Sequence, residues 1–129
     1  VNRLHNLYAA ILVLGGNKMN VYDTANKLAQ EIKQSEEFLT YQTAKQAINL
    51  NFELKQKIDE FEKARYEAQI VALQTGKDDE NKMKHVQALY GELIQNEEAS
   101  RYFDAEMKFN LLIADVNKII GNVVQELLK

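Results

Sequence analysis

The last quarter of the chain decides the fold, and its residues 96–128 read NEEASRYFDAEMKFNLLIADVNKIIGNVVQELL. Apolar residues recur here at spacings of three and four, the periodicity of one side of an α-helix. They form two neighbouring rows. The first row contains Tyr102, Ala105, Phe109, Leu112, Val116, Ile119 and Val123, and the second contains Phe103, Met107, Ile113, Ile120, Val124 and Leu127. The pattern predicts one long helix with two adjacent apolar faces.

A thin antiparallel arrangement of long helices has too little interior to cover both rows. A bare apolar row of this length exceeds what soluble monomers usually expose. We therefore expect a partner helix, and a second copy of the chain related by a two-fold axis is the simplest partner. The sequence predicts a homo-oligomer, most simply a dimer. Its expected interface residues are Tyr102, Phe103, Phe109, Leu112, Ile113, Val116, Ile119, Ile120, Val123 and Val124.

The composition favours helices in the rest of the chain as well. The 129 residues include no proline and only five glycines, so residues that break helices are rare. Apolar periodicity and capping residues predict further helices over about 21–34, 35–48 and 52–74, and from Asp78 or Asp79 to about 95. The predicted fold class is all-α, with long antiparallel helices that form a helical hairpin or bundle completed by oligomerisation.

A thirteen-residue pattern occurs at the starts of two of these helices. Residues 35–47 read SEEFLTYQTAKQA and residues 96–108 read NEEASRYFDAEMK, with four identical positions. Ser35 and Asn96 are residue types that cap helix N-termini, and glutamates favour the positive end of the helix dipole. We interpret the pattern as the same helix N-capping sequence occurring twice. Duplication of a half-unit is an open alternative, and a duplicated binding site is the least supported one.

Residues 1–18 differ from the rest because they contain no acidic residue. Their apolar run, residues 7–14, is shorter than the roughly 20 residues that cross a bilayer. A small-residue cleavage site of a signal peptide is missing. Because Met19 is a plausible native start, we interpret residues 1–18 as a translated upstream leader or non-native extension, and residues 19–129 as a single helical domain. An N-terminal helix packed on the body is the alternative.

Residues that usually carry chemistry are scarce. The chain has no cysteine and two histidines, His5 and His85, neither of which belongs to the Glu-x-x-His pairs of di-iron bundles. The two serines have no histidine base in a recognisable pattern, and no phosphate-binding loop is present. We therefore expect no enzymatic activity, no cofactor, and no catalytic, cofactor-binding or metal-binding residues.

The charge pattern is that of solvated helix faces. The net charge of −3 at pH 7 makes a poor platform for nucleic-acid phosphates, so we expect neither direct nucleic-acid binding nor a membrane partner. Acid-to-base pairs four residues apart are expected to stabilise the helices slightly. These pairs are Glu53–Lys57, Asp59–Lys63, Asp78–Lys82, Glu80–Lys84, Glu97–Arg101 and Asp104–Lys108.

Several stretches resemble one known family. They read NVYDTANKLAQEIKQSEEF at 20–38, KIDEFEKAR at 57–65, IQNEEASRYFDAEMKF at 94–109 and IADVNKIIGNVVQELL at 113–128. In this order they resemble the YheA-like (UPF0342) branch of the YlbF/YmcA-like (Com_YlbF) helical proteins of Gram-positive bacteria. The resemblance implies an all-helical, oligomeric, cytoplasmic protein without known enzymatic activity.

The wider family also implies a kind of role. Its better-understood members act in complexes that influence competence, sporulation, biofilm formation and mRNA processing by an endoribonuclease. Iron–sulfur association in that group depends on cysteines, so it does not carry over to this chain. We predict a non-catalytic adaptor or regulatory protein that self-associates through its final helix. The alternative is an accessory factor of an mRNA-processing or competence–sporulation regulatory complex, with other regulatory proteins as partners.

Overall fold

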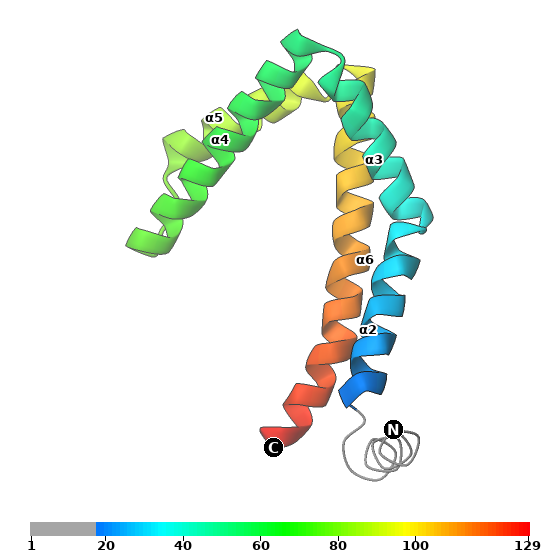
Figure 1. The fold of residues 1–129 in the computed structure, drawn as a ribbon. Helices are drawn as coiled ribbons and strands as arrows, with labels where there is room; N and C mark the ends of the chain where they lie inside the picture. Colours follow the sequence, from blue (N-terminus) through cyan, green and yellow to red (C-terminus); the bar gives the residue numbers. More distant parts are fainter. Residues whose placement is uncertain (1–17) are drawn as a thin grey trace, which may run out of the picture. The chain divides into compact units, whose positions relative to one another are not determined.

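The computed structural model describes residues 18–129, and their regular structure is entirely helical (Figure 1). The predicted all-α fold class is confirmed, and the predicted helix boundaries lie close to the observed ones. The helices are α2 Lys18–Lys33, α3 Glu36–Asn49, α4 Phe52–Thr75, α5 Glu80–Leu93 and α6 Glu97–Leu127. The 31 residues of α6 form a rod about 46 Å long at 1.5 Å per residue.

The chain divides into two compact units, Val1–Leu39 and Thr40–Lys129, and the division falls inside α3. The described part of the first unit consists of α2 and the start of α3, and the second contains everything after it. The expectation of a single domain over residues 19–129 stays a prediction. The leader interpretation of residues 1–18 also stays a prediction, because these residues lie outside the described part except for Lys18, which begins α2.

Four of the described helices begin at a capping side chain. In each, an oxygen of the cap accepts a hydrogen bond from the backbone N–H three residues later. These bonds join Ser35 Oγ to Phe38 N at 3.1 Å, Asn51 Oδ1 to Leu54 N at 3.2 Å, Asp79 Oδ1 to Lys82 N at 3.1 Å, and Asn96 Oδ1 to Ala99 N at 3.1 Å. Both copies of the repeated pattern therefore start a helix with the predicted capping side chain, Ser35 or Asn96.

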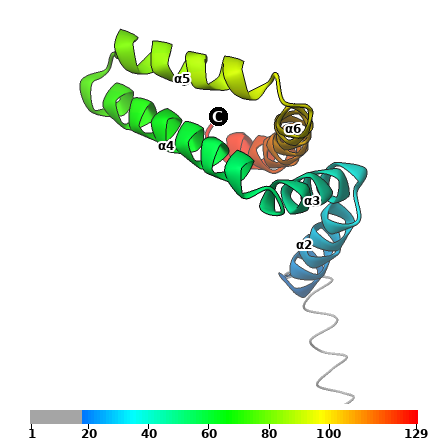
Figure 2. The same ribbon diagram turned by 90° about the horizontal axis from the view of Figure 1, so that it is seen from above.

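The helices α4 and α5 form an antiparallel hairpin and lie side by side (Figure 2). Gly76 ends α4 in the left-handed conformation, with a φ angle of 74°, and its N–H donates to the Ala72 carbonyl at 2.9 Å. Glycine has no Cβ and adopts this conformation without strain. Asp79 then caps α5, so the chain reverses its direction over a few residues. The predicted helical hairpin is present.

The core of the second unit lies where the hairpin meets the first turns of α6. Phe61 of α4 and Phe103 of α6 have ring centroids 5.4 Å apart, and the Tyr90 ring of α5 contacts both. Such ring pairs stabilise beyond the burial of their apolar area. The buried residues of this cluster are Ile48, Leu54, Ile58, Phe61, Leu93, Ala99, Tyr102 and Phe103. One small cluster therefore holds parts of α3, α4, α5 and α6 together.

Ion pairs along the helices follow the predicted pattern in part. Glu97–Arg101 and Asp104–Lys108 form at 2.6 and 3.1 Å. For Asp59 the predicted partner Lys63 is wrong, because its carboxylate lies 3.3 Å from Lys55, one turn earlier. Both lysines lie one turn from Asp59, so the spacing alone does not choose between them. All of these groups are largely exposed, and each pair contributes little to stability.

Removing the cap of α6 should destabilise the fold measurably. We expect Asn96→Ala to lower the free energy of unfolding by about 1 kcal/mol, because the Ala99 N–H loses its acceptor. Asn96→Ser keeps an oxygen acceptor and should stay close to wild type. Urea denaturation followed by circular dichroism measures both variants. Equal losses in the two would show that the side-chain bond does not stabilise α6.

Candidate functional site

The predicted interface residues occupy three environments along α6. Those nearest its start, Tyr102 and Phe103, are buried in the core of the same chain. The half-buried members are Phe109, Leu112, Ile113 and Val116. The exposed members are Ile119, Ile120, Val123 and Val124. The first turns of α6 therefore complete the chain's own core. The two apolar rows continue beyond this core toward the C-terminal end of the helix, where their residues are exposed.

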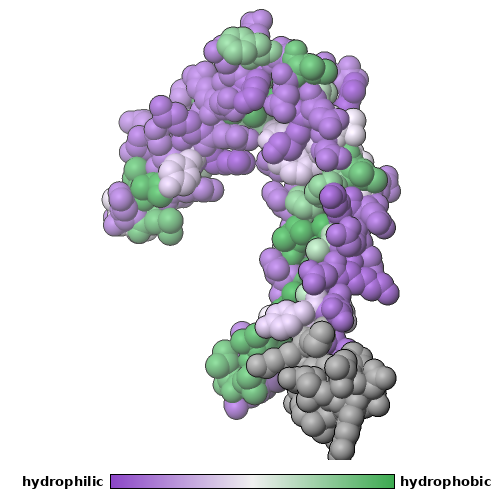
Figure 3. Space-filling view, in the orientation of Figure 1, coloured by the Kyte–Doolittle hydropathy of each residue, from purple (hydrophilic) through white to green (hydrophobic). Residues whose placement is uncertain are grey.

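The C-terminal part of α6 presents a continuous apolar surface. We call it the apolar face of α6 and define it as Ile119, Ile120, Val123, Val124 and Leu127, whose exposed fractions run from 54% to 86%. Their spacing places all five side chains on one side of the helix. Figure 3 shows hydrophobic residues along α6 and gathered at its C-terminal end. Isolated exposed apolar residues are ordinary, but a contiguous group is typical of a binding surface.

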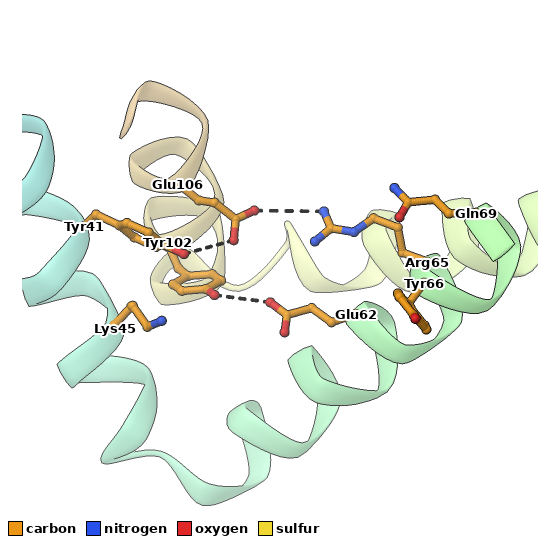
Figure 4. Close-up of a pocket in the computed structure, with 8 residues that line it drawn as sticks. All are labelled: Tyr41, Lys45, Glu62, Arg65, Tyr66, Gln69, Tyr102 and Glu106. Carbon is orange, nitrogen blue, oxygen red and sulfur yellow. Dashed lines mark hydrogen bonds and ion pairs between the residues drawn. The ribbon is translucent and has the colours of Figure 1, made fainter. Parts of the chain in front are cut away.

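A second feature is a hollow lined by residues of α3, α4 and α6, with a volume of about 380 Å³ (Figure 4). Residues one turn apart on each helix point into it, because side chains three and four positions apart share a helix side. The lining residues are Tyr41 and Lys45 of α3, Glu62, Arg65, Tyr66 and Gln69 of α4, and Tyr102 and Glu106 of α6. We call it the tyrosine–glutamate hollow.

Two tyrosine–glutamate hydrogen bonds join helices across this hollow (Figure 4). The Tyr41 hydroxyl donates to Glu106 Oε2 at 3.2 Å, and the Tyr102 hydroxyl donates to Glu62 Oε1 at 3.2 Å. The two tyrosine rings lie 5.7 Å apart. A second oxygen of Glu106 lies 3.9 Å from the Arg65 guanidinium. Glu106 of α6 is thus connected to both α3 and α4.

Burial raises the pKa of both tyrosines above the ordinary value of 10.0. For Tyr102 the pKa is raised mainly by burial, then by the neighbouring Tyr41 hydroxyl and the charge of Glu62. For Tyr41 burial is again the largest cause; the Tyr102 hydroxyl lowers the pKa in part, and Glu106 raises it. At neutral pH both phenols are therefore protonated and available to donate to the carboxylates.

The hollow combines groups that recognise a charged ligand. It holds two carboxylates, two cations and three phenol rings within one small volume. Among residues 18–129, no three His, Asp or Glu side chains are placed to hold a metal ion. None of the helices in that part of the chain is long and apolar enough to cross a membrane. The groups that are present favour recognition through hydrogen bonds, charge and aromatic contact.

Of the residues that line this hollow, the sequence predicted a role only for Tyr102, as an interface residue, and it did not predict the hollow itself. One signal for it exists in the repeated pattern, where Tyr41 corresponds to Tyr102 and Lys45 to Glu106. All four side chains line the hollow. The four-residue spacing within each copy does predict that both residues share a side of their helix. Which helix faces which depends on tertiary packing, so the pattern alone does not bring the two copies together.

Replacing Tyr102 should reveal its contribution to stability and to pH dependence. Because the folded pKa lies above the unfolded value of 10.0, the unfolded chain releases phenol protons first, and stability falls as the pH rises past 10. Tyr102→Phe should lessen this fall. At neutral pH it should lower the free energy of unfolding by about 1 kcal/mol, because the bond to Glu62 is lost.

Urea denaturation at about pH 7 and about pH 11 measures both effects. Tyr22→Phe is the matched control, because this side chain is 65% exposed and its hydroxyl should add nothing to stability. A Tyr102→Phe variant with the same pH dependence as wild type would contradict the assignment.

The comparison with known proteins agrees with this architecture. The model of the family described as "Control of competence regulator ComK, YlbF/YmcA" matches residues 21–125. A UPF0342 protein of Caldicellulosiruptor bescii is 34% identical over 106 residues, which cover 82% of this chain and 89% of the relative. A UPF0342 protein of Symbiobacterium thermophilum is 34% identical over 104 residues, covering 81% and 93%. The match spans most of the chain, and the chain therefore belongs to the YlbF/YmcA family, with similarity to its UPF0342 proteins, as the sequence predicted.

Proposed function

We propose that this chain is a non-catalytic adaptor or regulatory protein of the cytoplasm that self-associates, as a two-fold dimer, through the apolar face of α6. The observation that carries the proposal is the exposure of five apolar side chains on one side of this helix. The description of the family names the control of a regulator and not a reaction, which supports a regulatory role.

Burial of the apolar face would favour association. Full burial of a valine, leucine or isoleucine side chain contributes about 1.5–3 kcal/mol. Each side chain of the face is more than half exposed, so most of this contribution is still unrealised in a single chain. A two-fold pair uses the face twice, which offsets the loss of translational and rotational freedom on association.

A second copy matches the face in both chemistry and length. The spacing of three and four continues from the buried start of α6 into the exposed part, which is the periodicity of helices that pack side by side. Half-buried Leu112 and Val116 extend the same row toward the core. Two identical rows placed against each other would therefore form a longer contact than the five exposed residues alone.

Family membership also favours action within a larger regulatory complex. As a second candidate we propose an accessory role in an mRNA-processing or competence–sporulation complex with other regulatory proteins. Affinity purification from the native cell should then recover defined partner proteins, and deletion of the chain should change transcript ends. If partners and transcript ends were both unaffected, this candidate would lose its support.

Ile120→Asp should dissociate the dimer without unfolding the chain. Burying an unpaired carboxylate at the interface costs about 2 kcal/mol or more, which weakens association by about 30-fold or more. The side chain is 55% exposed in the single chain, so folding should be preserved, and circular dichroism checks this. Sedimentation equilibrium at micromolar concentration measures the association.

The matched control is Gln125→Glu. It adds the same charge at an exposed position on the side of α6 opposite the apolar face, and should leave association unchanged. A wild-type chain that is monomeric at micromolar concentration would reject self-association. Equal dissociation in both variants would reject the apolar face as its location.

A further inference from the structure

We propose that the tyrosine–glutamate hollow binds the guanidinium group of an arginine side chain presented by a protein partner. The inference goes beyond self-association, because the hollow uses α3, α4 and the early part of α6 and none of the apolar face. It is carried by the depth of the carboxylates, by the ring lining and by the available room.

One of the two carboxylates, that of Glu106, lies deeper in the hollow than either cation. The Glu106 side chain is 16% exposed, whereas the Arg65 side chain is 43% exposed and Lys45 is exposed as well. Glu62 is half-buried and accepts a hydrogen bond from Tyr102, but it forms no ion pair with any residue of the described chain. A half-buried carboxylate with only a neutral donor is stabilised by the arrival of a cation.

The cations of the chain itself approach the carboxylates only loosely. Arg65 lies 3.9 Å from Glu106, near the outer limit of an ion pair, and it also lies over the Phe61 ring. The Lys45 amine lies 5.4 Å from the centre of the Tyr41 ring and points toward the hollow (Figure 4). Both carboxylates thus keep acceptor capacity for a better-placed donor.

The rings that line the hollow suit a planar cation. Tyr66 is 64% exposed and has no ring partner within residues 18–129, so its face is open to a ligand. The faces of phenol rings carry negative potential and attract guanidinium groups. A guanidinium is flat, weakly hydrated and able to donate to a carboxylate through two parallel N–H groups. These properties favour arginine over lysine.

The space around Glu62 is sufficient for a whole arginine side chain. A neighbouring hollow of about 400 Å³ shares Lys45, Glu62 and Tyr102 with the first and extends to Ile48 and Ile58. The guanidinium would meet Glu62 and Glu106, and the apolar stem of the side chain would lie against the isoleucines. A backbone segment of the partner can then continue along α3 and α4.

The test uses two small probes of matched shape. N-acetyl-arginine methylamide carries the guanidinium, and N-acetyl-citrulline methylamide replaces it with a neutral urea group. Titration of each into the ¹⁵N-labelled full chain, followed by NMR, should show saturable shifts at Glu62 and Tyr102 with the arginine probe only. Equal shifts with both probes, or no saturation with either, would overturn the proposal.

Variants that change one charged side chain of the hollow test whether it prefers a cationic or an anionic ligand. Glu62→Gln keeps an acceptor for Tyr102 but removes the charge, so it should weaken arginine binding by about fivefold or more. Glu67→Gln, at an exposed position on the same helix, should leave binding unchanged. Lys45→Met removes a competing cation and should strengthen binding by about twofold. Weaker arginine binding in Lys45→Met, together with acetate binding in wild type, would show that the hollow takes anions instead.

The same titration separates this inference from self-association. The Ile120→Asp variant should bind the arginine probe as wild type does, whatever its oligomeric state. Loss of probe binding in that variant would mean that the hollow forms only in the assembled protein, which would contradict the independent site proposed here.

Discussion

The rest of the second unit depends on the packing of Phe61 against Phe103. Their rings meet at 5.4 Å, and the Tyr90 ring contacts both, where α4 and α5 reach the first turns of α6. Single helices expose most of their side chains, so buried apolar contact in the described chain is concentrated at this junction. A cavity at either phenylalanine would cost about 3–5 kcal/mol, a large share of the stability of a domain of this size.

The same junction fixes the two candidate binding surfaces relative to each other along α6. Tyr102 and Glu106 lie in the part of the helix that the core holds, and they form one wall of the tyrosine–glutamate hollow. Ile119 follows Glu106 by thirteen residues, about 20 Å along a straight helix. Because one continuous helix carries both surfaces, a partner can occupy the hollow while a second copy covers the apolar face.

The helix boundaries could be predicted from the sequence because their causes are local. Asn96 and Asp79 act on backbone groups three residues away, and Gly76 acts through its own backbone. What covers a helix face is not local. The spacing that put Tyr102 in the same row as Ile119 could not show that Tyr102 is buried in the core beside α3 and α4 while Ile119 stays exposed. The hollow required knowing that residues of α3, α4 and α6 meet, which no spacing within one helix reveals.

The two glutamates at the edge of the core favour a role in binding. Glu62 and Glu106 are half-buried beside buried aromatic rings, so each carboxylate loses part of its hydration on folding. Because ion pairs gain little net stability once desolvation is included, stability alone is a weak reason for two glutamates at these half-buried positions. The bonds from Tyr41 and Tyr102 satisfy one oxygen of each carboxylate. Glu106 has the Arg65 guanidinium at 3.9 Å, whereas Glu62 forms no ion pair within residues 18–129. A cation from outside the chain would pair with the Glu62 carboxylate. We therefore attribute the glutamates of the hollow to binding rather than to folding.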